Sequence, residues 1–220
     1  MIRDKVTHGV YGFLADYEKD THKAVGYIDE AHHMEIFNRV VLALVSSGVP
    51  SLEGKTVLDI GAGSGQIARF LVDKMGMKIE SYTGIERIEK LLSRQELTPP
   101  EFNEKGEQTN KQEPVFHIIA DKFPSEQIKE QFDVVLMVGT CSTYPMPWDL
   151  VKDAFNSVKD GGTLLFTMLD TDKYDGQFYA QTVDRMVAIA KMLGESFQFF
   201  GGRECVVTIQ KKAKVEDAPK

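Results

Sequence analysis

A short segment near residue 60 combines three glycines with an acidic residue. It reads VLDIGAGSGQ from residue 57 to residue 66. Gly61, Gly63 and Gly65 let the backbone turn sharply and let a ligand approach where a Cβ would collide. Apolar residues before the glycines predict a strand, and the following residues predict a helix whose first N–H groups are unpaired. The segment therefore predicts a ligand-binding loop between a strand and a helix.

The spacing in this loop favours a positively charged nucleoside over a dinucleotide. The dinucleotide fingerprint needs its third glycine at the position of Gln66, and here that glycine comes one residue early, at Gly65. Asp59 also places a carboxylate beside the loop. A negative charge there is unfavourable next to a pyrophosphate and favourable next to an ammonium or a sulfonium.

Two further acidic residues follow the next two predicted strands. Glu86 ends one of them, and Asp121 follows the other. Because ligands bind at the carboxyl ends of strands in open α/β sheets, both are expected beside the glycine loop. Glu86 is suited to accept hydrogen bonds from two ribose hydroxyls, and Asp121 from an exocyclic adenine amine. Either acid alone is equally typical of a solvated strand end, but with the loop they predict a nucleoside site.

The elements that must position these residues alternate between strands and helices, which predicts a parallel sheet with helices on both faces. A β-rich pair of runs flanks Gly201 and Gly202 and predicts a hairpin whose last strand runs antiparallel. The fold class is therefore α/β, doubly wound and Rossmann-like, with a seven-stranded, mostly parallel sheet. The strands are expected at residues 56–60, 79–85, 115–120, 132–138, 163–168, 196–200 and 204–210, and helices at 31–47, 66–75, 88–95 and 178–193.

The sheet domain is expected to span residues 55–211, with accessory segments around it. Residues 1–54 predict a helical accessory and lid segment that packs on the sheet. Residues 98–114 are polar and carry three prolines, so we expect a mobile surface excursion there. The charged residues 212–220 predict a tail.

Composition narrows the class of function. The net charge of the 220 residues is −7 and there is no dense basic block, which disfavours nucleic acid as a partner. The sequence contains no run of 18 apolar residues, so no membrane span is predicted. The first residues do not resemble a secretory signal. Only Cys141 and Cys205 are present, so we expect a cytoplasmic protein with neither a disulfide framework nor a metal site.

With these motifs in place, the chain resembles the class I S-adenosylmethionine-dependent methyltransferases. Asp59 to Gly65 matches the family's first motif in full: an acidic residue, any residue, then G-x-G-x-G. Glu86 and Asp121 match its acidic residues after the second and third strands. The resemblance covers roughly residues 55–211 and implies S-adenosylmethionine as the cofactor, with S-adenosylhomocysteine as the product.

The resemblance also implies a set of cofactor-binding residues. Arg87 would flank the adenine, Lys122 would contact it through its backbone, and Gly139 would lie near the methionine moiety. Tyr11 would close over the cofactor as part of a lid. The full set that the resemblance implies is Tyr11, Asp59, Gly61, Ala62, Gly63, Glu86, Arg87, Asp121, Lys122 and Gly139.

The acceptor of the methyl group is less constrained. Alignment of donor and acceptor can lower the barrier by about 7–11 kcal/mol, more than a general base adds, so we assign no catalytic residue. Aromatic residues in the accessory segment and the strand-end loops predict a substrate pocket formed by Tyr27, Tyr144, Trp148 and Tyr174. The favoured reaction is methyl transfer to oxygen or nitrogen of a small molecule. A protein or RNA methyltransferase and a non-catalytic cofactor-binding partner subunit are the alternatives, and the oligomeric state stays open.

Overall fold

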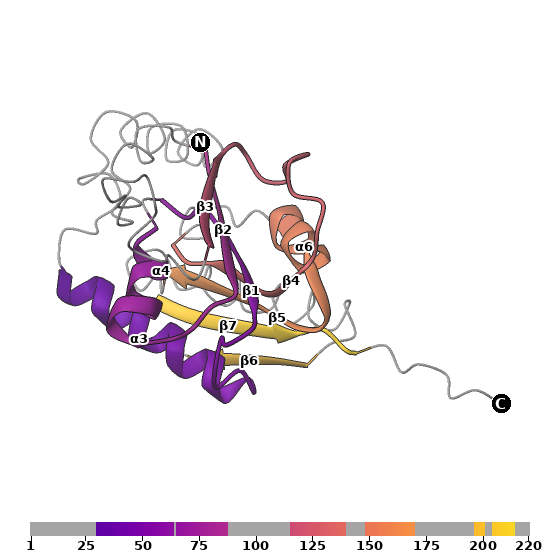
Figure 1. Ribbon diagram of the computed structural model, residues 1–220. Helices are drawn as coiled ribbons and strands as arrows, with labels where there is room; N and C mark the ends of the chain where they lie inside the picture. Colours follow the sequence, from indigo (N-terminus) through magenta and orange to yellow (C-terminus); the bar gives the residue numbers. More distant parts are fainter. Residues whose placement is uncertain are drawn as a thin grey trace, which may run out of the picture.

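A computed structural model describes residues 30–63, 65–87, 115–139, 148–169, 196–200 and 204–213. Within them, seven strands form one sheet in the order β3-β2-β1-β4-β5-β7-β6 (Figure 1). The strands are β1 (Thr56–Ile60), β2 (Ser81–Glu86), β3 (Val115–Ala120), β4 (Phe132–Met137), β5 (Val158–Leu169), β6 (Ser196–Phe200) and β7 (Glu204–Gln210). This arrangement confirms the predicted mostly parallel, doubly wound sheet.

The order of the strands changes direction at β1, because β2 and β3 lie on one side of it and β4 and β5 on the other. β1 pairs in parallel with β2 on one side and with β4 on the other. β2 continues to β3, and β4 continues to β5, also in parallel. The loop after β1 therefore lies at the switch point of the sheet, where ligands bind in such folds.

The hairpin at the end of the sheet is confirmed. β7 pairs antiparallel with β6 and also with β5, where Thr163 faces Gln210 and Leu169 faces Glu204. β7 thus lies between β5 and β6 in the sheet. Because β6 and β7 together extend the sheet beyond β5, the last strand is an interior strand.

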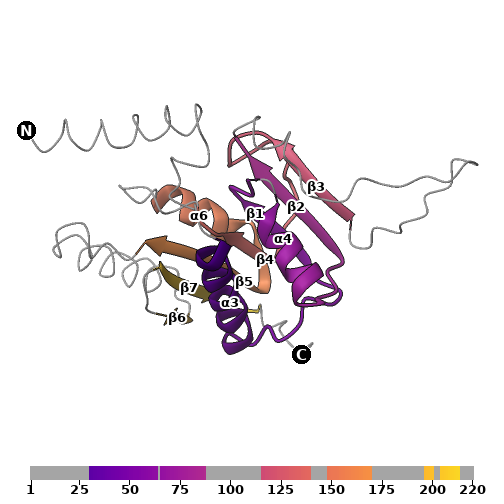
Figure 2. The ribbon, with the colours of Figure 1, turned by 90° about the vertical axis from the view of Figure 1, so that its left-hand side faces the viewer.

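Helices cover both faces of the sheet (Figures 1 and 2). One face carries α3 (Glu30–Ser46) and α4 (Gln66–Arg69), with α3 residues such as Val40 and Leu44 fully buried. The other face carries α6 (Trp148–Asn156), which buries Val151 and Ala154. Because an apolar core covers each face of the sheet, both faces of the central strands are buried, and their sequences are continuous apolar runs.

Three predicted elements differ from the structure by more than one residue at a boundary or in their helix type. The helix expected at 66–75 is α-helical only at first, and a π-helical turn, Phe70–Lys74, continues it. β2 begins at Ser81, two residues later than expected, and ends at Glu86. β5 begins at Val158, five residues early, because the Gly161-Gly162 pair lies inside the strand at a register shift rather than in a turn.

Buried polar contacts tie α3 to the antiparallel end of the sheet. The Ser47 hydroxyl lies 2.5 Å from the Thr208 hydroxyl on β7 and donates to Gln198 on β6 at 3.2 Å. The Gln210 side chain donates to the Ser47 carbonyl. These bonds satisfy polar groups at the buried end of α3, so the helix position is fixed by more than apolar packing.

A second polar cluster joins the amino ends of three parallel strands. The Asp133 carboxylate on β4 accepts the Thr56 amide at 2.9 Å, the Thr56 hydroxyl at 2.8 Å and the Lys159 ammonium at 2.9 Å. Partial burial raises the pKa of Asp133, but hydrogen bonds from Thr56 and Lys159 outweigh it, so the pKa lies below its usual value of 3.8. The ionised carboxylate is therefore the form that holds these strands.

Asp133→Asn is expected to lower the free energy of unfolding by about 1–2 kcal/mol at pH 7, because charge-assisted hydrogen bonds are lost. Since the pKa is lower in the folded state, this contribution is present above the unfolded-state pKa and disappears as the pH falls through the folded value. Urea unfolding from pH 2 to pH 7 measures it. A difference between variant and wild type that stays constant over this range would contradict the assignment.

Candidate functional site

The glycine loop is fixed to the neighbouring strand by its own backbone. The amides of Gly61 and Ala62 both donate to the Ile85 carbonyl of β2, at 2.8 and 3.1 Å. Gly61, Gly63 and Gly65 all have positive φ, between 56° and 80°. A Cβ on Gly63 would meet nothing within 4 Å. The loop therefore needs glycine for its backbone conformation and leaves open space above Gly63.

A fourth glycine, on β2, makes the close approach of this loop possible. A Cβ on Gly84 would lie 2.8 Å from the Ala62 Cβ, 3.0 Å from Ile118 and 3.3 Å from the Tyr82 ring. Gly84 is paired with Asp59 on β1. Gly84 is not one of the glycines with positive φ. The lack of room for a Cβ, and not the backbone conformation, therefore requires glycine here.

Glu86 closes the other side of the loop. Its carboxylate oxygen Oε2 accepts the amide of Gly63 at 3.0 Å, and the residue is only 7% exposed. The Glu86 carbonyl accepts the amide of Asp121 at 3.1 Å. The structure thus brings the ends of β1, β2 and β3 together, as the sequence predicted, with a carboxylate beside the loop.

Asp59 is buried directly before the loop, with its two carboxylate oxygens in different surroundings. The Tyr82 hydroxyl donates to Oδ2 at 2.5 Å, while Oδ1 has no hydrogen-bond partner among the described residues. The pKa of Asp59 is raised from 3.8 to about 7, because burial raises it more than the Tyr82 hydrogen bond lowers it, and the negative charge of Glu86 adds to the rise. Burial also raises the pKa of Tyr82 well above 10, so its hydroxyl remains the donor.

These observations fit a cofactor that carries a positive charge. A buried carboxylate oxygen without a partner is costly, and a cationic donor would satisfy it. The hydrogen-bond acceptors that a nucleoside needs are also present, because Glu86 ends β2 and Asp121 directly follows the adjacent strand β3. The cofactor would lie in the open space above the loop, held by Asp59, Gly61, Gly63 and Glu86.

Asp121 begins a tight turn after β3 and is bonded within it. Oδ1 accepts the Lys122 amide at 2.7 Å, and Oδ2 accepts the Ser125 hydroxyl at 2.6 Å and the Gln127 amide group at 3.4 Å. The Ser125 and Lys122 hydrogen bonds lower the pKa of Asp121, so it is ionised at neutral pH. A carboxylate offers about four lone-pair positions, which leaves capacity for one more donor.

Gly139 follows β4 and is held by a residue of β5. Its amide donates to the Thr167 hydroxyl at 2.7 Å, and its φ is 75°. Thr167 is completely buried. The turn after β4, where the methionine moiety is expected, is therefore positioned by a side chain on the neighbouring strand.

Thr167→Val is expected to lower the free energy of unfolding by about 1 kcal/mol, because the Gly139 amide loses its acceptor. We also expect cofactor affinity to fall about threefold to tenfold, measured by calorimetric titration, since the turn after β4 loosens. Thr208→Val is the matched control: it removes another buried hydroxyl bond, to Ser47, away from the glycine loop. Equal affinities of the two variants would contradict the role given to Thr167.

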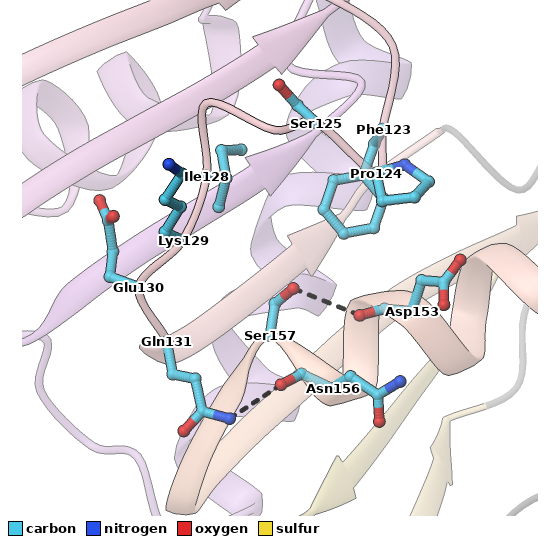
Figure 3. A pocket seen from close by; sticks show the side chains of 10 residues that line it. All are labelled: Phe123, Pro124, Ser125, Ile128, Lys129, Glu130, Gln131, Asp153, Asn156 and Ser157. Atoms are coloured by element: carbon cyan, nitrogen blue, oxygen red, sulfur yellow. Dashed lines mark hydrogen bonds between the residues drawn. The ribbon is translucent and has the colours of Figure 1, made fainter.

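A separate cavity of about 300 Å³ lies between the β3–β4 connection and the end of α6 (Figure 3). Phe123, Pro124 and Ile128 line it with polar residues of both segments, and Gln131 donates to the Asn156 carbonyl at 2.9 Å. The cavity adjoins the amino ends of β4 and β5, opposite the edge that carries the glycine loop. None of the glycine-loop residues 61–65 lines it, although Ser125 in its wall donates to the Asp121 carboxylate.

The remaining predicted site residues are placed only in part. Arg87 and Lys122 are exposed directly after β2 and after Asp121. Trp148 is the first residue of α6. Four predicted residues lie outside the described ranges: Tyr11, Tyr27, Tyr144 and Tyr174. The excursion at 98–114, the helices at 88–95 and 178–193, and most of the accessory segment and tail also lie outside them.

Sequence reasoning missed Tyr82, Gly84 and Thr167. Gly84 had a usable signal, because a glycine inside a strand marks a close approach. Tyr82 and Thr167 had none, since their partners are distant in the sequence. The helix α6 was also missed, although Leu150, Val151 and Ala154 have helical spacing.

No group of three or more His, Cys, Asp or Glu in the described ranges is arranged to hold a metal ion. None of the helices described is long and apolar enough to span a membrane.

Comparison with solved structures supports the same fold. The chain superposes on a plantazolicin methyltransferase in complex with a monoazolic desmethylPZN analog and SAH, with a TM-score of 0.63 and 12% identity over 96% of this chain and 99% of that chain. Magnesium protoporphyrin IX methyltransferase from Synechocystis PCC 6803 with bound SAH gives a TM-score of 0.60 and 14% identity, covering 92% and 100%.

Comparison by sequence identifies the family. Ubiquinone biosynthesis O-methyltransferase from Pseudomonas putida (strain F1) is 30% identical over 120 residues, covering 54% of this chain and 47% of that protein. The corresponding enzyme of Hydrogenovibrio crunogenus is 27% identical over 120 residues. This chain thus matches about half the length of these relatives. The family model described as "Methyltransferase domain" matches residues 31–203, so the chain belongs to this family, among the class I S-adenosylmethionine-dependent methyltransferases.

Proposed function

We propose that this protein transfers a methyl group from S-adenosylmethionine to oxygen or nitrogen of a small-molecule acceptor. The observation that carries the proposal is the arrangement of Asp59 and Glu86 on either side of the open glycine loop at the switch point. The cofactor supplies an activated methyl group on a sulfonium. The chain supplies binding and orientation.

Different residues of the site bind different parts of the cofactor. Glu86 accepts hydrogen bonds from the ribose hydroxyls, and Asp121 accepts a hydrogen bond from the adenine amine. The buried carboxylate of Asp59 faces positive charge of the methionine part, and Gly139 forms the turn beside it. Arg87 and the Lys122 backbone flank the adenine. Because alignment supplies most of the rate in such a transfer, no general base is required.

A small acceptor is supported by two observations. The relatives matched at 27–30% identity are named for O-methylation in ubiquinone biosynthesis. The net charge of −7 opposes a polyanionic substrate. Tyr11 would close over the cofactor, and Tyr27, Tyr144, Trp148 and Tyr174 would enclose the acceptor. We place the protein in the cytoplasm, because its two cysteines show no disulfide pattern.

The test is a calorimetric titration with S-adenosylmethionine, S-adenosylhomocysteine and NAD in parallel, followed by a methylation assay on small phenols and amines. We expect saturable binding of both adenosyl ligands, no binding of NAD, and turnover with members of one acceptor class. Binding without turnover, or turnover only on protein or RNA, would reject the small-molecule acceptor. Binding of NAD alone would reject the cofactor site.

A further inference from the structure

Tyr82 reaches Asp59 diagonally across two strands. Tyr82 pairs with Val57 on β1, whereas Asp59 pairs with Gly84. The Tyr82 ring passes 3.3 Å from the position that a Gly84 Cβ would occupy. The missing side chain at Gly84 therefore provides the space in which the tyrosine hydroxyl meets the carboxylate.

This contact leaves the Asp59 carboxylate in a defined state. Both side chains are almost fully buried, and the Tyr82 hydroxyl donates to Oδ2 of Asp59. Oδ1 is buried and has no hydrogen-bond partner among the described residues. With Oδ2 held, the carboxylate cannot rotate without breaking the bond to Tyr82, so the direction of Oδ1 is fixed.

We propose that Tyr82 is a positioning residue of the cofactor site: its hydroxyl holds Oδ2 of Asp59 so that Oδ1 is presented, ionised, to a positive charge of the bound cofactor. The inference rests on the proposed function, because it needs that cofactor to bind beside the glycine loop. Tyr82 itself does not contact the reacting atoms.

The surroundings of Asp59 make its ionisation sensitive to such a ligand. Among the described residues, the titratable groups that act on it are Tyr82 and Glu86, both from β2. β4 contributes the apolar Leu136 at the paired position, and the neighbouring α4 buries the apolar Ile67. Burial and the charge of Glu86 favour the protonated form, and Tyr82 opposes them. A cation beside Oδ1 would therefore lower the pKa of Asp59 and favour its ionised form.

The first experiment uses the wild-type protein. Affinity for S-adenosylmethionine and S-adenosylhomocysteine is measured by calorimetry from pH 5.5 to 8.5, in buffers of different ionisation enthalpy. We expect affinity to rise up to about tenfold per pH unit below pH 7 and to level off above it, with proton release on binding. The same profile for both ligands identifies the ammonium as the partner of Asp59, and a profile only for S-adenosylmethionine identifies the sulfonium.

The second experiment uses Tyr82→Phe. Loss of the hydrogen bond raises the pKa of Asp59, so the pH midpoint should move up by about one unit. Affinity should then fall about fivefold at pH 7 and recover near pH 8.5. In an Asp59→Asn background the same change should have no further effect on the profile. Ser47→Ala, which removes a buried hydroxyl elsewhere, is the structural control and should leave the midpoint unchanged.

Three results would overturn these proposals in distinguishable ways. A pH-independent affinity of the wild type would overturn the inference and leave the cofactor site standing. A uniform loss of affinity in Tyr82→Phe at every pH would assign Tyr82 a purely structural role. Failure of both adenosyl ligands to bind the folded wild type at any pH would overturn the proposed function itself.

Discussion

Glu86→Ala is expected to lose at least about a hundredfold in affinity for S-adenosylmethionine, because each of two charge-assisted hydrogen bonds to the ribose contributes about 1.5–3 kcal/mol. The fold should survive, since the strand contacts of residue 86 are made by its backbone: its carbonyl still accepts the Asp121 amide. Calorimetric titration gives the affinity, and circular dichroism with thermal unfolding checks the fold.

Glu80→Ala is the matched control for this change. It removes the same charge from an exposed residue just before β2. We expect its affinity to stay within a factor of two of the wild type, because exposed charges at a distance are screened by salt. If Glu86→Ala bound the cofactor as tightly as Glu80→Ala, the assignment of the ribose site to Glu86 would be wrong.

Gly84→Ala is expected to lower both the stability of the protein and its affinity for the cofactor. The added Cβ would meet the Ala62 Cβ at 2.8 Å and Ile118 at 3.0 Å. Forcing a methyl group into a packed interior costs about 1–3 kcal/mol, and here relief requires moving the glycine loop away from β2. Both the free energy of unfolding and the cofactor affinity should therefore fall, the affinity by about tenfold or more.

Gly162→Ala separates these two effects. Its Cβ would meet the Asp133 carbonyl at 2.7 Å and Val158 at 2.8 Å, near the amino ends of β4 and β5. The clash is comparable, but it lies at the opposite edge from the loop. Urea unfolding and titration of both variants at 10 °C should show loss of stability in each and loss of affinity only in Gly84→Ala. Equal affinities would mean that the loop does not depend on Gly84.

Local sequence patterns were sufficient to locate most strands and the position of the glycine loop after β1. β1, β3, β6 and β7 have the predicted bounds because each is a short apolar or β-rich run between turn residues. The glycine loop and the ends of β2 and β3 follow from the same alternation of strands and helices. Asp59 and Glu86 could be placed beside one another because parallel strands end at a common edge.

The rest depended on contacts between distant residues. The hydrogen bond of Thr167 to Gly139 and that of Tyr82 to Asp59 join different strands. Gly161-Gly162 resembles a turn in isolation, yet the Gly161 amide donates to the Lys211 carbonyl and keeps the pair within β5. Such bonds depend on the register between strands, which no local pattern specifies.

The interior position of β7 has a consequence for synthesis on the ribosome. β6 precedes β7 in the chain but is separated from β5 by it in the sheet. While residues 204–210 are still inside the exit tunnel, β5 keeps an open edge and β6 has no strand to pair with. Open edges of this kind recruit other chains, so the nascent protein is most exposed to aggregation just before its last strand emerges. Completion of the sheet therefore follows the emergence of β7, long after the glycine loop has emerged.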